Sequence, residues 1–191
     1  TADWGGGIDI RESDNVMLEN LTVTGNTAAD YGGGIYIYVS DNVILNSLTV
    51  TGNTAAYYGG GISIVSCSPT LDDLIIENNT ALSDGGGIDI LQNNNSTISN
   101  IIVRNNESSW GGGIYLHGDV SPIIYNAEVS NNYAETNAGG IYVRDGATPI
   151  LYNLTIYGNS TNGEGGGLLT WYHTSFTKIN NSIIYSNTPS N

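Results

Sequence analysis

The chain of 191 residues is poor in positive charge: four Lys and Arg residues stand against 18 Asp and Glu residues, and the formal net charge is −14. A surface of this sign repels nucleic acids and anionic membranes, so we expect neither as a partner. No apolar run approaches the length of about 18 residues typical of a membrane-spanning helix, which predicts no membrane insertion. The opening TADWGGG has neither the basic nor the apolar segment of a signal peptide and fits a processed chain.

Cysteine is nearly absent as well, and the single Cys67 excludes an internal disulfide framework. The short patterns HEXXH, paired CXXC, GXSXG and GXXXXGK[ST] do not occur, so zinc, nucleophile and phosphate-loop chemistries have no support. We expect no metal and no cofactor. A single weak calcium site stays open, because Asp9 and Asp89 each follow a glycine cluster.

Glycine, in contrast, is abundant, and clusters of it recur at a fixed period. The clusters are centred on or begin at Gly5, Gly32, Gly59, Gly85, Gly111, Ala138 and Gly165, with spacings of 27, 27, 26, 26, 27 and 27 residues. Such self-similarity is the mark of a repeat architecture. We therefore expect seven copies of one unit, together forming a single domain over residues 1–191.

Asparagines keep the same period in two columns. One column contains Asn26, Asn53, Asn79, Asn106, Asn132, Asn159 and Asn187, and the other contains Asn20, Ser47, Asp73, Asn100, Asn126, Asn153 and Asn181. Asn tolerates left-handed backbone, and its amide can bond to the equivalent amide one repeat away. Both columns are predicted to be structural ladders inside the molecule.

Apolar residues within each unit alternate, as in Ile8 and Ile10, and no window carries a helical stripe. The pairs Val16 with Leu18 and Leu21 with Val23 continue the period of two. Three short strands per 26 or 27 residues predict an all-β solenoid whose strands pair in parallel with their equivalents one coil along. Glycine before the first strand allows a sharp turn and close stacking of successive backbones.

On these repeats, the chain resembles right-handed parallel β-helix repeat proteins of the pectate-lyase-like architecture, and the resemblance covers the whole chain. The GGGI tetrapeptides also resemble the glycine motif of polymorphic outer-membrane proteins, whose companion F-x-x-N motif is missing here. The resemblance implies a right-handed coil and an extracellular or cell-surface location. It does not assign a function, because the architecture hosts lyases, hydrolases, adhesins and structural repeats.

In pectinases of this architecture, catalysis uses a calcium-bound substrate with an Arg or Lys base, or clustered aspartates. The resemblance therefore directs attention to basic residues, and Arg11, Arg104, Arg144 and Lys178 lie on different coils. His117 and Asp119 in LHGD are expected in a solvated turn, and His173 lies in the atypical last coil. We predict no catalytic residue and favour a protein without enzymatic activity. If it is an enzyme, it is a polysaccharide lyase or a glycoside hydrolase.

Aromatic residues form the most suggestive columns. Trp4, Tyr31, Tyr58 and Trp110 precede glycine clusters, and Tyr36, Tyr115 and Tyr142 take the outward position of the first strand. Equivalent residues of successive coils stack about 4.8 Å apart, which predicts a row of exposed rings. Such a row stabilises the sheet, contacts a glycan or docks another subunit. Among the N-x-[ST] sequons, Asn95 in the turn NNNST is the candidate for glycosylation.

The chain holds close to an integer number of coils, and a solenoid has an unpaired sheet edge at each end. We expect a structural protein that associates end to end into a filament, or a rigid surface stalk or adhesin segment. The alternative is a polysaccharide-binding or polysaccharide-cleaving β-helix.

Overall fold

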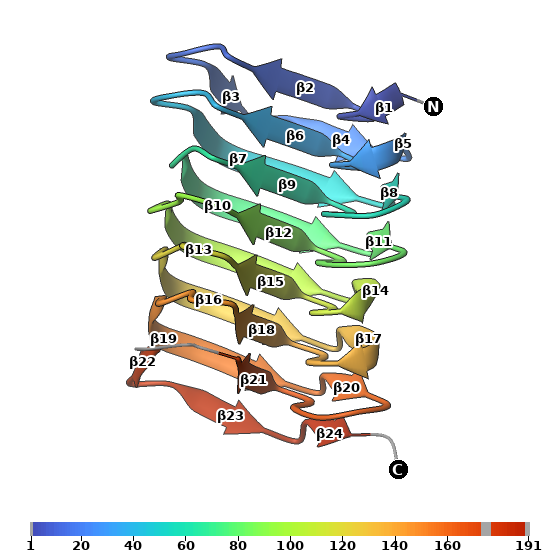
Figure 1. Ribbon diagram of the computed structural model, residues 1–191, viewed down its shortest axis with the longest axis vertical. Coiled ribbons are helices and arrows are strands. Elements are labelled where there is room, and N and C mark those ends of the chain that lie inside the picture. Colours follow the sequence, from blue (N-terminus) through green and yellow to red (C-terminus); the bar gives the residue numbers. More distant parts are fainter. Residues whose placement is uncertain (1, 173–176, 190–191) are drawn as a thin grey trace.

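The computed structural model describes residues 2–172 and 177–189. These residues form about seven coils of a right-handed parallel β-solenoid, stacked along one axis with the termini at opposite ends (Figure 1). Strands of neighbouring coils pair in parallel and in constant register, as Ile62 does with Ile35 and Ile88. The predicted all-β repeat fold is confirmed, and the described residues contain no helix that could cross a membrane.

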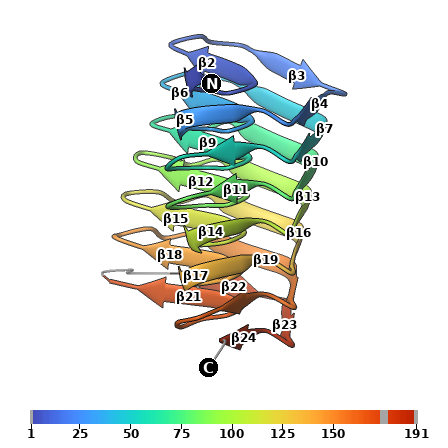
Figure 2. The ribbon, with the colours of Figure 1, turned by 90° about the vertical axis from the view of Figure 1, so that its right-hand side faces the viewer.

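Three sheets run the length of the stack, and Figure 2 shows sheet A towards the viewer with sheets B and C on either side. Sheet A contains β1 (Ala2–Trp4), β5 (Thr27–Tyr31), β8 (Thr54–Ala55), β11 (Thr80–Ala81), β14 (Glu107–Trp110), β17 (Tyr133–Asn137), β20 (Ser160–Thr161) and β24 (Thr188–Pro189). Sheet B contains β2 (Ile8–Arg11), β6 (Ile35–Tyr38), β9 (Ile62–Val65), β12 (Ile88–Leu91), β15 (Ile114–His117), β18 (Ile141–Arg144) and β21 (Leu168–Trp171). Sheet C contains β3 (Met17–Glu19), β4 (Thr22–Thr24), β7 (Ile44–Thr51), β10 (Thr70–Glu77), β13 (Thr97–Arg104), β16 (Ile123–Ser130), β19 (Ile150–Tyr157), β22 (Lys178–Asn180) and β23 (Ile183–Tyr185).

The three strands of a coil differ from those that the apolar alternation predicted. The segments around Leu18 and Val23 both belong to sheet C, and in β7 and its equivalents they form one strand of eight residues. A residue in left-handed conformation, such as Ser47 with φ of 55°, bends this strand without ending its pairing. The third strand of the coil is the short sheet A segment that follows the asparagine, which the alternation did not reveal.

The core is a column of stacked Ile, Leu and Val side chains enclosed by the three sheets. Ile62 and Ile64 of β9, Leu71 of β10 and their equivalents in neighbouring coils are fully buried. The glycine clusters lie where sheet A turns into sheet B, and Gly60 shows why they exclude side chains. A Cβ at Gly60 would lie 2.5 Å from the carbonyl oxygens of Gly86 and Thr80, too close for any side chain. The coils therefore stack backbone on backbone at this corner.

The two asparagine columns differ in location. In the column of Asn53, each Oδ1 accepts hydrogen bonds from the amide and the backbone N–H of the previous coil's asparagine, at 3.0 Å from Asn53 to Asn79. The Asn53 amide also donates to the carbonyl of Val23, so a buried polar chain runs along the axis. The column of Asn100 lies on the outside of the sheet C bend, which corrects the prediction of a second internal ladder. Asn, Asp or Ser occupies each of these positions, where the backbone adopts left-handed φ.

Candidate functional site

A groove follows the outer side of the corner between sheets A and B. The last residue of a sheet A strand and the outward-facing residue of the next sheet B strand are separated by the glycine turn. Left-handed backbone at the turn, as at Gly32 with φ of 63°, folds these two positions towards each other. The Tyr31 and Tyr36 ring centroids, for example, lie 5.6 Å apart. Three residue columns therefore line what we call the A/B groove.

The three columns are defined by the strand register. The sheet A column contains Trp4, Tyr31, Tyr58, Asp84, Trp110 and Asn137. The inner sheet B column contains Asp9, Tyr36, Ser63, Asp89, Tyr115, Tyr142 and Leu169, and the outer sheet B column contains Arg11, Tyr38, Val65, Leu91, His117, Arg144 and Trp171.

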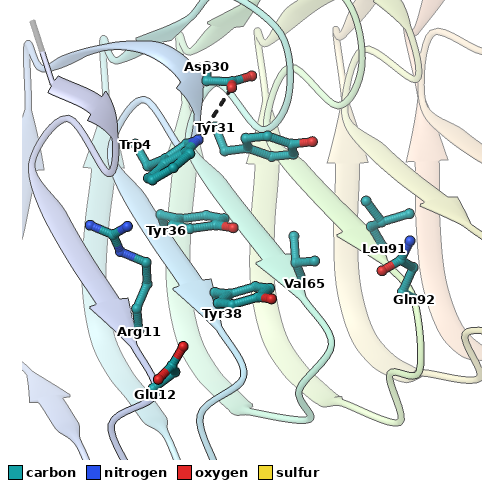
Figure 3. A pocket seen from close by; sticks show the side chains of 10 residues that line it. All are labelled: Trp4, Arg11, Glu12, Asp30, Tyr31, Tyr36, Tyr38, Val65, Leu91 and Gln92. Carbon is teal, nitrogen blue, oxygen red and sulfur yellow. Dashed lines mark hydrogen bonds between the residues drawn. The ribbon is translucent and has the colours of Figure 1, made fainter.

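A first hollow of about 590 Å³ occupies the groove over the early coils (Figure 3). Its lining residues are Trp4, Arg11, Glu12, Asp30, Tyr31, Tyr36, Tyr38, Val65, Leu91 and Gln92. The Trp4 indole N–H donates to the Asp30 carboxylate at 3.3 Å, and the Arg11 guanidinium lies 4.8 Å from the Trp4 ring centroid. These contacts hold the indole at the edge of the hollow, where 38% of its surface is exposed.

A second hollow of about 280 Å³ lies over the later coils. It is lined by Trp110, Asn137, Tyr142, Arg144, Trp171 and Tyr172. Trp110 stacks on Tyr142 with centroids 6.0 Å apart, and the Arg144 guanidinium lies 5.9 Å from the Tyr142 ring centroid. The two hollows thus share an aromatic character, and between them they contain all three tryptophans of the chain.

Part of the predicted aromatic row is covered rather than exposed. Tyr36, Tyr115 and Tyr142 expose only 6%, 3% and 1% of their surface. Rings of the sheet A column lie over Tyr36 and Tyr142, and Tyr115 packs between His117 and Tyr142. Burial accordingly raises the pKa of Tyr36 to about 12. Trp4, Tyr31, Tyr58 and Trp110 form the accessible layer, while the three buried tyrosines form its floor.

A polar cluster interrupts the aromatic columns between the two hollows. Asp84 and Asp89 belong to the same coil, one in the sheet A column and one in the inner sheet B column. The Asp89 side chain is fully buried, and its Oδ1 lies 3.2 Å from Nε2 of His117 in the next coil. The two atoms are not aligned as a hydrogen bond. Ser63 donates to the other oxygen of Asp89 at 3.4 Å.

Electrostatics couple the members of this cluster. Burial and the neighbouring Asp89 charge raise the pKa of Asp84 to about 6, although Ser83 donates to Asp84 at 3.0 Å. Burial alone would lower the pKa of His117, but the Asp89 carboxylate, with Asp84 and Asp145, raises it overall. The cluster therefore changes charge close to neutral pH.

Only part of this cluster could be predicted from the sequence. His117 was expected in a solvated turn, but it ends β15 and its side chain is only 15% exposed, whereas Asp119 lies exposed in the turn. The missed residue was Asp84, which replaces an aromatic ring in the sheet A column of the same coil as Asp89.

The remaining candidates lie elsewhere or are already paired. Arg11 contacts Asp9 at 2.6 Å and Arg144 contacts Asp145 at 2.7 Å in the groove. Arg104 pairs with Glu77 at 2.7 Å on sheet C, far from His117 in the coil. His173 lies outside the described residues.

Asn95 is exposed in the turn before β13, so its side chain is accessible and its glycosylation stays a prediction. Within residues 2–172 and 177–189, no three His, Cys, Asp or Glu side chains are grouped to hold a metal ion. The weak calcium site stays untested.

The sequence matches the family described as right handed beta helix region in two overlapping stretches, residues 3–127 and 99–190. Neither the curated proteins nor the solved structures contain a significant match.

Proposed function

The chain belongs to the right-handed β-helix family, and we propose that it is a polysaccharide-binding module that holds an extended sugar chain along the A/B groove. The observation that carries this proposal is the placement of all three tryptophans in the two hollows, Trp4 in the first and Trp110 and Trp171 in the second. Tryptophan and tyrosine offer large amphipathic faces, which suit the apolar faces of sugar rings. An extracellular or cell-surface location is part of the proposal.

The dimensions of the groove support an extended ligand. The hollows lie along the axis of a molecule in which successive coils are about 4.8 Å apart, so together they span several coils. Carboxylates at Glu12, Asp30 and Asp84 line or adjoin the groove, and the chain carries a net charge of −14. Neutral and cationic polysaccharides therefore fit this surface better than polyuronates do.

Tryptophan fluorescence tests this proposal, because every tryptophan reports on the groove. Soluble hexasaccharides of cellulose, xylan, mannan, chitin, chitosan and polygalacturonate are titrated into the protein, and calorimetry supplies the affinities. We expect at least one neutral or cationic hexasaccharide to bind, and Trp110→Ala to weaken it by about tenfold, the loss of roughly 1.4 kcal/mol.

The matched control is Tyr152→Ala. Tyr152 stacks on Tyr125 with centroids 5.1 Å apart, but on the outside of sheet C, away from the groove. This variant removes a stacked ring and is expected to bind normally. Equal weakening by both substitutions, or the absence of binding to every hexasaccharide, would contradict a glycan-binding groove.

End-to-end assembly is the second candidate function. Leu21 of the first coil and Ile183 and Ile184 of the last are exposed, whereas their equivalents inside the stack, such as Leu48, Thr155 and Ile156, are buried or partly buried. In the proposed contact the first coil of a second copy follows the last coil, and Asn26 of that copy accepts the hydrogen bond that continues the ladder from Asn187. The stalk or adhesin role stays a further prediction.

Electron microscopy and sedimentation test this assembly. Stacked copies give fibres with a layer line near 4.8 Å and an axial repeat of roughly 34 Å, seven coil spacings. Ile183→Glu places a charge in the contact and is expected to abolish fibres, whereas Tyr152→Glu on the side of the rod leaves them intact. A concentration-independent monomer would exclude the assembly.

A further inference from the structure

The polar cluster of Asp84, Asp89 and His117 lies between two hollows of a groove that is otherwise largely aromatic. Asp84 follows Tyr58 and precedes Trp110 in the sheet A column, so it takes the place of an aromatic ring. Asp84 is partly exposed to the groove, while Asp89 lies behind it with no exposed side-chain surface. A ligand that spans both hollows must pass over Asp84.

The charges of this cluster are not balanced by the protein. Two carboxylates face one imidazole, because the nearby Arg144 guanidinium already contacts Asp145 at 2.7 Å. The Oδ1 atom of Asp89 is buried, and its one close polar neighbour among the described residues is Nε2 of His117 at 3.2 Å, so His117 is already committed to Asp89. Four tyrosines are further titratable neighbours, and burial raises the pKa of each hydroxyl so that it stays uncharged: Tyr31, Tyr58, Tyr115 and Tyr142. Among the described residues, the three carboxyl groups of Asp84, Asp89 and Asp145 therefore outnumber the two basic side chains, His117 and Arg144.

We propose that the Asp84–Asp89 cluster is a subsite for a positively charged amino group, and that the polysaccharide bound in the A/B groove contains unacetylated amino sugars. The inference rests on the proposed function and adds the chemical class of the ligand. An ammonium group can donate N–H to the partly exposed Asp84 carboxylate, with the buried Asp89 charge behind it, and the accessible faces of Tyr58 and Trp110 favour a cation beside them.

Other ligand groups match the cluster less well. A uronate carboxylate would meet Asp84 as a like charge, and a neutral acetamide would leave that negative charge unbalanced. The pKa of Asp84 agrees with a shortage of positive charge, since burial and Asp89 raise it to about 6 and the opposing effects of His117 and Arg144 offset this only in part. A bound ammonium would favour the ionised carboxylate.

Calorimetry with two matched ligands tests the inference. The probes are the glucosamine hexasaccharide and its fully N-acetylated counterpart, measured near pH 6 at low ionic strength, where exposed charges are least screened. We expect the amino form to bind at least tenfold more tightly, and Asp84→Asn to remove that preference. Asp119→Asn, which deletes a carboxylate in an exposed turn outside the cluster, is the matched control and is expected to retain it.

A pH series supplies a readout that a purely structural role would not change. Between pH 4.5 and 6 the wild-type preference for the amino form should grow as Asp84 ionises, because this range lies on the acid side of its pKa of about 6. Asp84→Asn should show no such growth, and its thermal unfolding confirms that it is folded.

The outcomes separate this inference from the proposed function. Equal affinity for the two hexasaccharides, or a preference for the acetylated form, overturns the amino-group subsite and leaves a glycan-binding groove in place. An amino preference that Asp84→Asn and Asp119→Asn retain equally also overturns it, because general surface charge then accounts for the preference. Failure of both probes and of every neutral hexasaccharide contradicts the groove itself.

Discussion

At the scale of single residues, the inner asparagine ladder shows how a solenoid buries polar groups without loss. Asn79 is fully buried, donates to the carbonyl of Val50 at 2.9 Å and to Asn106 at 3.1 Å, and accepts from Asn53. Each amide thus has partners in the coils on both sides. Such satisfied networks specify one arrangement, because a missing member leaves its neighbours unpaired.

Replacing one ladder member is therefore expected to be costly. Asn79→Ala leaves the Val50 carbonyl and the Asn53 amide without their partner, which should lower the free energy of unfolding by about 2–4 kcal/mol. Asn95→Ala, in an exposed turn, should change it by less than about 0.5 kcal/mol. Urea denaturation measures the free energy of unfolding of the two variants. Similar free energies would show that the ladder does not stabilise the fold.

The polar cluster predicts an unusual dependence of stability on pH. Because the folded protein raises the pKa of Asp84 to about 6, the folded state binds more protons than the unfolded state below that pH. Stability from Asp84 is thus highest in acid and falls as the pH rises to about 6. The raised pKa of His117 acts in the same direction, since its contribution is lost as the pH rises through the folded pKa.

Asp84→Asn isolates this effect. Relative to wild type, the variant should gain roughly 1–3 kcal/mol of unfolding free energy between pH 4 and pH 7.5, because it carries no charge to desolvate. Denaturation at the two pH values measures the gain. Asp119→Asn serves as the control with no gain, and a pH-independent difference for Asp84→Asn would show that the carboxyl titrates normally.

At the scale of elements, glycines at two different corners of the coil have different requirements: Gly60 lies between sheets A and B, and Gly25 lies between β4 and β5. Gly60 has no room for a Cβ, whereas Gly25 has left-handed φ of 68° and open space around it. Gly60→Ala should therefore force the stacked backbones apart and cost several kcal/mol or prevent folding, and Gly25→Ala should cost about 1 kcal/mol of backbone strain. Thermal unfolding compares them, and a tolerated Gly60→Ala would contradict the close stacking.

The elements also explain how much of the molecule was predictable from the sequence. The glycine and asparagine periods predicted the parallel solenoid, because a repeated chemical requirement leaves a repeated residue. The groove was harder to predict from the sequence, because it depends on the turn angle at Gly32 and its equivalents. Alternation places Tyr36 outside the core, but it cannot show that Tyr31 and Trp4 cover its ring. The pairing of Asp89 with His117 required the register between β12 and β15.

At the scale of the whole molecule, each coil contacts only its neighbours, so stability is distributed along one dimension. The middle coils have partners on both sides, as β10 has β7 and β13, whereas in the described part of the chain β22 and β23 pair only with β19. Hydrogen exchange is expected to be slowest for amides of β10, β13 and β16 and fastest for those of β22, β23 and β24. Mass spectrometry of exchanging peptides measures this gradient, and uniform protection would indicate a single cooperative unit.

The constant register of the stack has a consequence for how such a chain changes over generations. The segment LTVTGNTAA occurs twice, at residues 21–29 and 48–56, one coil apart. Unequal recombination between such copies adds or removes one whole coil, and the glycine corner, the asparagine ladder and the three sheets all remain in phase. The length of the A/B groove can therefore be inherited in steps of about 4.8 Å, so that selection can match it to ligands of different length without redesigning the fold.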